Sequence, residues 1–498
     1  RCLVGSEMCI RDRLSTGFAG IEAIRRELED FKDSGKFIVS YGDYYTQGAY
    51  YLCSVADSVF LNPQGSVSLV GLASQGLFFT GLAEKIGVEH YIFKVGTYKS
   101  AVEPFFLKKF SDANREQLTS FLGSVWGNLT TAIEKSRNIS SDELDRYLNE
   151  GLAMGQASNA VDYKLADGLR YRYEVENCVK EMAGQDVKGK LKTAGVDKVA
   201  SIKVKEKDSG NKIAVLYAEG EIRDDDSSSP FSADEQVISE EMANKLRKLK
   251  DDDDVKAVVF RVNSPGGSAY ISEQIWKEVV ELKAKKPIVV SMGNYAASGG
   301  YYISCAANKI VAERTTLTGS IGVFGVVRNF TGTFDKVGVT TDIVKTNTFA
   351  DLGDISRPMR EDEKALIQRG VEQTYDLFLT RCADGRGMTK AEIDSIGQGR
   401  VWTGEQALER GLVDQLGGMD DAIKEAATLA ELTDYSVIVA DGPKDFFTKF
   451  MEKQMDEVKV SIAKSVMGEE QFKLFSTIRR AETESGIIAR MPFDIKGL

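Results

Sequence analysis

The most restrictive feature of this 498-residue sequence is how little histidine it contains, with His90 as the single example. A Ser-His-Asp triad would have to use that side chain, and a metal site built from several imidazoles is excluded. The six cysteines lie far apart and form no CxxC pair, which argues against a zinc site and leaves the redox compartment open. If a hydroxyl acts as a nucleophile in this protein, lysine is the natural candidate for its base.

Positive charge is also scarce, because 64 lysines and arginines stand against 75 acidic residues and give a net charge of −11. Nucleic-acid binders present basic patches, so we expect no nucleic-acid partner. The sequence has no run of about eighteen apolar residues, and no segment of it predicts a membrane-spanning helix. With 42% hydrophobic residues, it can still build two or three domains with full cores.

Small residues, in contrast, are concentrated in one stretch. The apolar run at 288–292 predicts a buried strand, and residues 293–302 predict a tight turn followed by the start of a helix. Small neighbours leave the Ser298 hydroxyl uncovered at the helix N-terminus, where free N–H groups and the helix dipole favour negative charge. The pattern fits either a nucleophile or an ordinary turn serine, and its partners must decide between them.

An internal repeat connects this stretch with a second one near the start of the chain. Residues 41–51 align without a gap to residues 292–302, and the offset of 251 positions holds over about sixty residues. Ser298 corresponds to Gln47, and Ala350 corresponds to Lys99. Each repeat has kept one reactive group that the other lacks. This complementary loss predicts one composite site, with Ser298 as nucleophile and Lys99 as general base.

Lysine works as a base near neutral pH only if its pKa falls well below the usual value of about 10.4. Burial among apolar groups lowers a lysine pKa, and residues 93–105 around Lys99 are rich in apolar and aromatic side chains. Ser320 is a candidate for orienting the amine, although the sequence alone shows only a turn serine. His90 corresponds to Thr341 in the other repeat, and we interpret it as structural.

A second glycine-rich turn is predicted at residues 263–268, directly after an apolar strand. Its plain interpretation is a Pro-Gly turn between a strand and a helix. In the functional interpretation, the N–H of Gly266 or Gly267 joins the N–H of Gly299 to form an oxyanion hole beside Ser298.

Alternating strands and helices predict an α/β fold with parallel strands. Residues 1–13 differ in pattern from the rest, and we interpret them as a foreign segment. The remaining chain is divided into an N-terminal repeat with the general-base lysine, a linker, a C-terminal repeat with the nucleophilic serine, and a C-terminal extension with an amphipathic helix: 14–182, 183–211, 212–436 and 437–498. The first repeat has no counterpart of residues 213–262, so we expect it to be truncated at its N-terminus.

Five phrases give the chain a resemblance to the signal peptide peptidase A family in its long, double-repeat form: VNSPGGS, AASGGYY, LTGSIGVFG, VGTYKSAVEPF and VWTGEQALERGLVD. The resemblance implies two tandem repeats of the Clp-protease-like, crotonase-type fold. It also implies a serine endopeptidase in which Ser298 is the nucleophile, Lys99 the general base and Ser320 the hydrogen-bond partner of the lysine. No metal and no organic cofactor are implied.

The same resemblance implies a cellular setting. Its members are understood to degrade released, hydrophobic signal peptides and other extended apolar peptides as homo-oligomers, here a tetramer. The implied location is the bacterial cytoplasmic membrane, with the catalytic part on the extracytoplasmic side. The membrane anchor and the first strands of the family are missing from this sequence.

Two other functions stay open at this point. An acyl-CoA enzyme could use the same crotonase-type fold, but no nucleotide-binding signature is present, and the retained serine and lysine would go unexplained. A non-catalytic membrane scaffold is the second alternative. Thermal stabilisation by coenzyme A would favour the first, and specific labelling of Ser298 by a serine-reactive probe would disfavour the second.

Overall fold

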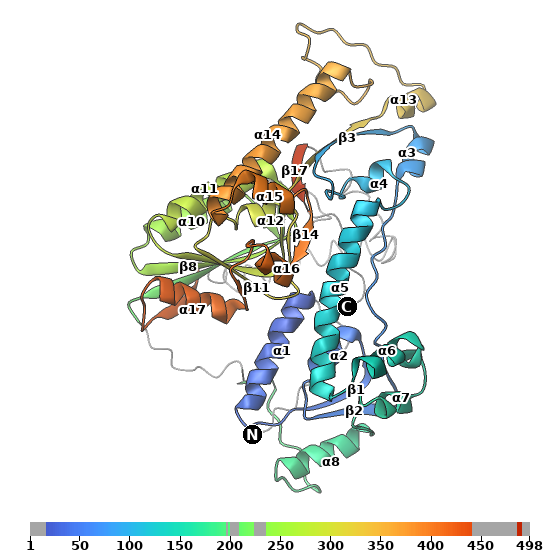
Figure 1. Ribbon diagram of the computed structural model, residues 1–498, viewed down its shortest axis with the longest axis vertical. Helices are drawn as coiled ribbons and strands as arrows, with labels where there is room; N and C mark the ends of the chain where they lie inside the picture. Colours follow the sequence, from blue (N-terminus) through green and yellow to red (C-terminus); the bar gives the residue numbers. More distant parts are fainter. Residues whose placement is uncertain (1–15, 196–197, 200–208, 224–235, 441–485, 491–498) are drawn as a thin grey trace.

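The structure is a computed structural model that describes residues 16–195, 198–199, 209–223, 236–440 and 486–490. Residues 1–13 and the predicted amphipathic helix of the C-terminal extension lie outside the described residues. Figure 1 shows an elongated molecule in which most of the N-terminal repeat forms the lower end. The long helix α5 runs upward from there, and α3, α4 and β3 reach the C-terminal repeat at the upper end.

The N-terminal repeat is built on a small sheet of order β1-β2-β4, in which the strands run parallel. Its strands are Val39–Tyr45, Ser58–Val67 and Gly168–Leu169. Buried tyrosines and aliphatic side chains join this sheet to the surrounding helices. These helices are α1 (Phe18–Asp33), α2 (Gln47–Cys53), α5 (Asp112–Arg137), α6 (Ser141–Asn149), the 3₁₀ turn η2 (Leu152–Met154) and α7 (Ala157–Asp162), with α8 (Arg172–Met182) at the lower edge.

The C-terminal repeat contains the larger sheet, of order β14-β12-β10-β8-β5-β16, with β11 beside β10 and β15 beside β11. All of its pairings are parallel except that of β12 with β14. The strands are β5 (Lys212–Glu219), β8 (Val255–Ser264), β10 (Ile288–Ala297), β11 (Lys309–Ala312), β12 (Leu317–Gly319), β14 (Val401–Thr403), β15 (Gln415–Leu416) and β16 (Ser436–Val439). This arrangement confirms the predicted α/β fold.

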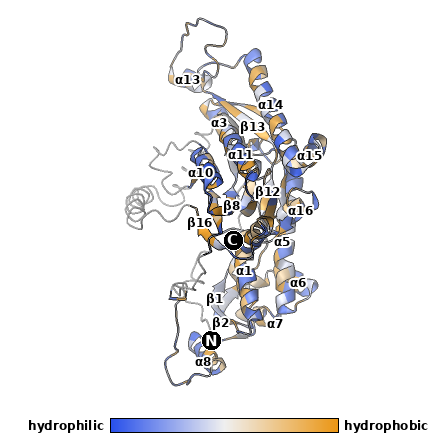
Figure 2. Ribbon diagram, turned by 90° about the vertical axis from the view of Figure 1, so that its left-hand side faces the viewer, coloured by the Kyte–Doolittle hydropathy of each residue, from blue (hydrophilic) through white to orange (hydrophobic). Residues whose placement is uncertain are grey.

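Both faces of this sheet are covered by helices, which explains why its strands read as continuous apolar runs. Val258 and Phe260 of β8 pack toward one core, and Ala257 and Val259 pack toward the other. The first core includes residues of α10 (Glu241–Asp251), α11 (Ala269–Lys283), α12 (Gly299–Tyr302), α14 (Glu361–Arg386), α15 (Lys390–Ile396) and α16 (Gly404–Glu409). Helix α17 (Met419–Leu429) covers the second core. Figure 2 shows hydrophilic residues along outer helices such as α10 and α6.

A third sheet joins the two repeats and has the order β3-β13-β17-β9-β6-β7. Strand β3 (Glu89–Val95) of the N-terminal repeat pairs antiparallel with β13 (Val323–Asn329) of the C-terminal repeat along its whole length. Strand β17 (Gly486–Arg490) lies antiparallel between β13 and β9 (Gly266–Ser268). The short strands β6 (Glu221–Ile222) and β7 (Val237–Ile238) complete the sheet. The chain that follows β3 is thereby held next to the chain that precedes β13.

Two helices of the N-terminal repeat have counterparts of equal length in the C-terminal repeat. Helices α3 (Thr80–Ile86) and α13 (Thr331–Val337) have equal length, and each ends at a left-handed glycine, Gly87 or Gly338. Helices α5 and α14 both contain 26 residues. Helix α4 (Glu103–Phe106) follows the loop that carries Lys99.

The strands before both predicted turns are longer than expected, so that part of the predictions was wrong, while the predicted tight turn and helix start are present at Ser298 and α12. Strand β10 continues through Gly293 to Ala297, and an added Cβ at Gly293 would lie 2.8 Å from Asn263 Oδ1. Strand β8 likewise continues to Ser264, and the predicted Pro-Gly turn forms β9. Within the described residues, no helix combines the length and the hydrophobicity needed to cross a membrane.

Candidate active site

Ser298 lies at the junction of β10 and α12, in an unusual backbone conformation. Its φ is 56° and its ψ is −115°, a positive φ that serine rarely adopts. The Ser298 N–H donates to the carbonyl of Gly319 at 2.8 Å, and its own carbonyl accepts from the N–H of Tyr302 at 2.8 Å. Such strained conformations persist only when the surroundings hold them, and they cluster at functional sites. The fixed turn directs the side chain into the buried space between the repeats.

The structure brings Lys99 to this serine within one chain. The Lys99 Nζ lies 2.8 Å from Ser298 Oγ, 3.1 Å from Ser320 Oγ and 3.2 Å from the carbonyl oxygen of Ser320. The Lys99 side chain is fully buried, and the ring centroid of Phe324 lies 6.0 Å from its amine. Two residues 199 positions apart in the sequence are therefore within hydrogen-bond distance.

Burial lowers the pKa of the Lys99 amine well below its ordinary value, because the charged form loses its hydration in this site. Within the part of the chain that the structure describes, no carboxylate forms an ion pair with the amine that would oppose this effect. The site therefore favours a neutral amine, which can accept a proton.

Ser320, predicted to orient the lysine, also has a positive φ, of 51°, and is fully buried. Its N–H donates to the carbonyl of Arg400 at 2.7 Å. Gly319 before it also has a positive φ, and a Cβ at that position would lie 2.9 Å from Trp402 Cδ1. This turn is thus fixed by the chain around residue 400, and it presents two oxygen atoms to the lysine.

The three glycines predicted for an oxyanion hole lie close together. A Cβ added to Gly299 would lie 3.1 Å from both Gly266 Cα and Gly267 N, and 2.9 Å from Ser272 Oγ. The N–H of Gly266 donates to Ser264 Oγ at 3.1 Å. Gly299 opens the short helix α12, where an N–H has no partner within the helix. That helix has only four residues, so the dipole argument made from the sequence is weaker than expected.

His90 and the cysteines of the described chain, the other residues considered from the sequence, take no part in the contacts of Ser298 and Lys99. His90 sits on β3, and its ring centroid lies 5.0 Å from that of Phe105. Among the described residues, no cluster of His, Cys, Asp and Glu side chains has the arrangement of a metal site. The sequence analysis did not single out Gln117, residues 398–400 or β17, which border the site and carry no recognisable motif; Val401 entered it only as the first residue of the phrase VWTGEQALERGLVD.

A cavity of about 1350 Å³ lies elsewhere, and its lining does not include Ser298 or Lys99. It lies between the repeats, and its walls include α1, α5 and the chain near Glu313. Its charged side chains are partly paired with one another, as in the contact of Arg26 with Glu313 at 2.8 Å. The buried contacts of Ser298 with Lys99 are therefore separate from this cavity.

Comparison with known proteins adds to this geometry. The family model described as Peptidase family S49 matches residues 30–186 and 280–433, and the model described as Clp protease matches residues 231–321. The S49 match to both halves confirms the predicted duplication, and the Clp match agrees with the predicted type of fold.

Three relatives carry informative names. The chain is 37% identical over 473 residues to Protease 4 of Salmonella typhi, covering 94% of this chain and 75% of that protein. It is 34% identical over 427 residues to the chloroplastic serine protease SPPA of Arabidopsis thaliana, covering 84% of this chain and 62% of that protein. It is 38% identical over 245 residues to the putative signal peptide peptidase SppA of Enterococcus faecium, covering 49% of this chain and 71% of that protein.

Proposed function

Because the chain belongs to peptidase family S49 and is a serine protease, we propose that Ser298 is its nucleophile and Lys99 its general base. The observation that carries this proposal is the 2.8 Å distance between Lys99 Nζ and Ser298 Oγ in a fully buried site. Nucleophile and base at hydrogen-bond distance, with a third group orienting the base, are the usual geometry of covalent catalysis. Ser320 is that third group.

The neutral amine has two hydrogens and one lone pair, which suits the three oxygen atoms around it. Its hydrogens are donated to the carbonyl and the hydroxyl of Ser320, and its lone pair accepts the hydroxyl proton of Ser298. Ser298 Oγ attacks the carbonyl carbon of the scissile peptide bond while Nζ takes the proton. The tetrahedral intermediate then breaks the C–N bond, and Lys99 returns the proton to the leaving amine.

The second half of the reaction repeats these roles with water. Lys99 takes a proton from a water molecule that attacks the acyl-enzyme ester, and it returns that proton to Ser298 as the acid product leaves. No step needs a metal or an organic cofactor.

For the oxyanion hole we favour the N–H groups of Gly267 and Gly299. The N–H of Gly266 is engaged with Ser264 Oγ, which makes Gly266 the weaker of the two alternatives left open by the sequence. Loss of one such donor typically costs on the order of 3 kcal/mol of transition-state stabilisation.

The third sheet supports an extended peptide as substrate. Residues 486–490 form a strand antiparallel to both β9 and β13, so a peptide in that position would be bound through its backbone on both sides. Strand β9 carries Gly266 and Gly267, so the scissile carbonyl would lie beside the proposed oxyanion hole. Degradation of released signal peptides at a membrane, by a homo-oligomer such as a tetramer, is part of this proposal. The name of the Enterococcus relative supports the signal-peptide substrate.

The deciding experiment compares Ser298→Ala with the unchanged protein on a hydrophobic peptide ester, together with labelling by a serine-reactive probe. We expect Ser298→Ala to lose hydrolysis and labelling while keeping its melting temperature. The matched control is Ser395→Ala, which removes an exposed hydroxyl that donates to the carbonyl of Glu392 at 2.7 Å. Full hydrolysis by Ser298→Ala would refute the proposed nucleophile.

The substrate position is tested separately by ending the chain after Ser485. Removal of β17 frees the space between β9 and β13, so we expect the KM for a peptide substrate to fall several-fold with little change in kcat. Loss of kcat in the shortened chain would show instead that β17 is a fixed wall of the site.

A further inference from the structure

The proposed dyad is assembled from two repeats, and its geometry depends on how they are held in register. Lys99 follows β3 of the N-terminal repeat, whereas Ser298 and Ser320 belong to the C-terminal repeat. An error of about 1 Å in such an arrangement can cost about a hundredfold in rate. Some part of the chain must therefore fix the lysine loop against the serine turn.

The backbone of residues 398–401 lies between these two segments and contacts both. On the lysine side, the N–H of Tyr98 donates to the carbonyl of Gln398 at 2.8 Å. On the serine side, the N–H of Gly399 donates to the carbonyl of Ile321 at 2.7 Å, and the carbonyl of Arg400 accepts from the N–H of Ser320 at 2.7 Å. Three consecutive residues, 398–400, thus form hydrogen bonds with the loop that carries Lys99 and with the turn that carries Ser320.

The strip formed by residues 398–401 also touches Lys99 itself. Gly399 has a φ of 77°, and a Cβ at that position would lie 2.6 Å from Lys99 N and 2.7 Å from Lys99 Cα. Gln398 has a positive φ of 52°, which is uncommon for glutamine. The guanidinium of Arg400 lies 4.6 Å from the ring centroid of Tyr98 and 4.5 Å from that of Trp402. The residue before the lysine is therefore held by its side chain as well as by its backbone.

Gln117 on α5 joins the lysine loop to the strip by a single amide group. Its Nε2 donates to the carbonyl of Tyr98 at 2.9 Å and to Ser100 Oγ at 2.9 Å, so it contacts the residue on each side of Lys99. Its Oε1 accepts from the N–H of Val401 at 3.3 Å. Gln117 is fully buried, where an amide that lost these partners would not be compensated by water.

We propose that Gln117, acting with the backbone of residues 398–401, is the positioning residue that holds Lys99 against Ser298 across the two repeats. This inference rests on the proposed dyad, and Gln117 itself touches neither substrate nor reacting atoms. Its amide is suited to the task because it both donates to the lysine loop and accepts from the strip. A loosened loop would misplace the amine and admit water to it.

The test replaces Gln117 by methionine, which has a similar length and shape. Methionine forms none of these three hydrogen bonds, and it also loses the one that Gln117 Nε2 donates to Asn114 Oδ1 at 3.1 Å within α5. We expect kcat to fall at least about tenfold, with KM within about twofold of the unchanged protein. We also expect the ascending limb of the kcat–pH profile to move to higher pH, because a hydrated amine must lose its proton at a higher pH before it can act as a base.

A matched control separates positioning from stability. Asn128→Ala removes another side chain of α5 that spans the repeats, since Asn128 Nδ2 donates to Glu405 Oε2 at 3.0 Å without contacting the lysine loop. This control should lower the melting temperature and leave the pH limb in place. If Gln117→Met keeps the kcat and pH limb of the unchanged protein, or loses activity only in step with its melting temperature as the control does, the positioning role is refuted.

Two further variants keep the test decisive. If Gln117→Met does not fold, Gln117→Glu preserves the shape and the acceptor for Val401 but cannot donate from a carboxylate, and it should also move the pH limb upward. Lys99→Ala separates this inference from the dyad: an active Lys99→Ala overturns the proposed function. An inactive Lys99→Ala beside an unaffected Gln117→Met overturns only the positioning role.

Discussion

The loop that carries Lys99 and its counterpart that carries Ala350 occupy corresponding places in two related repeats, yet their environments are opposite. Lys99 is fully buried between the repeats, whereas residues 335–350 are exposed throughout. In Figure 1 the second loop extends above α13 and α14, away from the rest of the molecule. A lysine at position 350 would be an ordinary solvated charge, so retention of the amine in the first repeat follows from which loop is covered.

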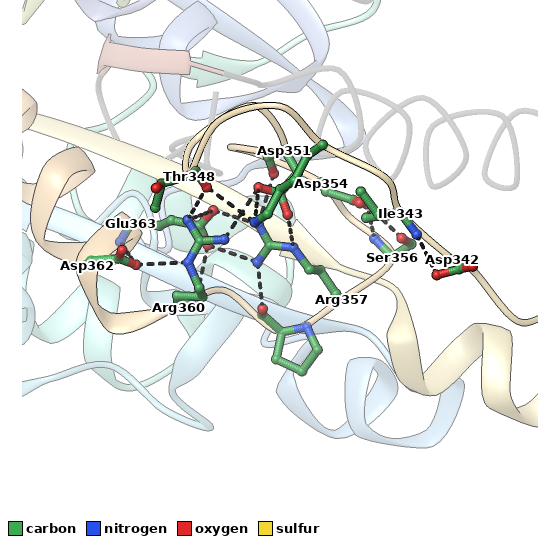
Figure 3. A network of polar contacts seen from close by, with 12 residues as sticks. Asp342, Ile343, Thr348, Asp351, Asp354, Ser356, Arg357, Arg360, Asp362 and Glu363 are labelled. Carbon is green, nitrogen blue, oxygen red and sulfur yellow. Dashed lines mark hydrogen bonds and ion pairs between the residues drawn. The ribbon is translucent and has the colours of Figure 1, made fainter.

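The two loops also differ in how their charged groups are paired. Beneath the exposed loop, Arg357 contacts Asp351 at 2.8 Å and Glu363 at 2.6 Å, and Arg360 contacts the same two carboxylates (Figure 3). Hydrogen bonds from Lys345 and Arg357 hold the pKa of Asp351 below its usual range, and Arg357 does the same for Glu363. These groups stay ionised. The Lys99 amine, which lacks a carboxylate partner among the described residues, is free to be neutral.

The position of Ser298 also differs between the repeats, and here the first repeat has lost the reactive group. Gln47, at the place that corresponds to Ser298, accepts from the N–H groups of Val70 and Gly71 at 2.9 and 2.7 Å. Its Nε2 also donates to the carbonyl of Gly71 at 3.1 Å. The side chain in the first repeat thus ties a turn together, whereas its counterpart in the second repeat is free to react.

The largest effect is expected from removing the amine. Lys99→Ala should reduce kcat by about 10³-fold or more, because the Ser298 hydroxyl loses its base. The measurement is hydrolysis of a hydrophobic peptide ester at saturating substrate. Lys94→Ala, at a lysine on β3 five residues before Lys99, is the matched control and should retain activity. Adding Ala350→Lys to Lys99→Ala should restore nothing, and restored activity would contradict the contrast between the two loops.

A smaller effect is expected from Ser320→Ala. The amine keeps the carbonyl of residue 320 as one partner and loses the hydroxyl at 3.1 Å, so we expect kcat to fall about 10- to 100-fold with little change in KM. Thr318→Ala removes a nearby buried hydroxyl that donates to the carbonyl of Ala296 at 2.7 Å, and it should cost stability without this loss of rate. Equal kcat values for the two variants would argue against a role for Ser320 in orienting the amine.

Much of this site could be predicted because the two internal repeats of the sequence can be compared with each other. The constant offset of 251 residues placed Lys99 opposite Ala350 and Ser298 opposite Gln47, and the structure brings the two retained groups together. The apolar run at 288–292 also located the first half of β10. Apolar runs of this kind reflect the burial of one element, which is a local property.

The rest depends on contacts between distant segments. Gly293 lies inside β10 with the Asn263 side chain packed against it, a contact that no local pattern of glycines reveals. Gln117 resembles any polar residue of a long helix, and its role arises from Tyr98 and Val401, which approach it from different repeats. The position of β17 likewise depends on two strands that are far away in the sequence.

The ion-pair network beneath the exposed loop is expected to serve stability alone. Arg357→Ala would leave Glu363, whose side chain is 1% exposed, without its main partner. We expect the melting temperature to fall on the order of 5 °C while kcat stays within about twofold of the unchanged protein. Thermal unfolding and peptide-ester hydrolysis measured on the same sample provide the check. A large loss of kcat at unchanged melting temperature would mean that this loop contributes to catalysis after all.

The smallest effect concerns stability and has a definite sign. Burial lowers the pKa of Lys99 in the folded state, so the unfolded chain binds a proton more readily and the lysine destabilises the fold below its ordinary pKa of about 10.4. The loss in free energy of unfolding grows as the pH falls from about 10.4 toward the lowered pKa of the folded state. Below that lowered pKa, the loss stays constant. Lys99→Met should therefore raise the melting temperature by a few degrees at pH 7, and the gain should vanish toward pH 10.5. A gain that did not depend on pH would reflect packing, and a loss at pH 7 would mean that the hydrogen bonds to Ser298 and Ser320 outweigh the desolvation of the amine.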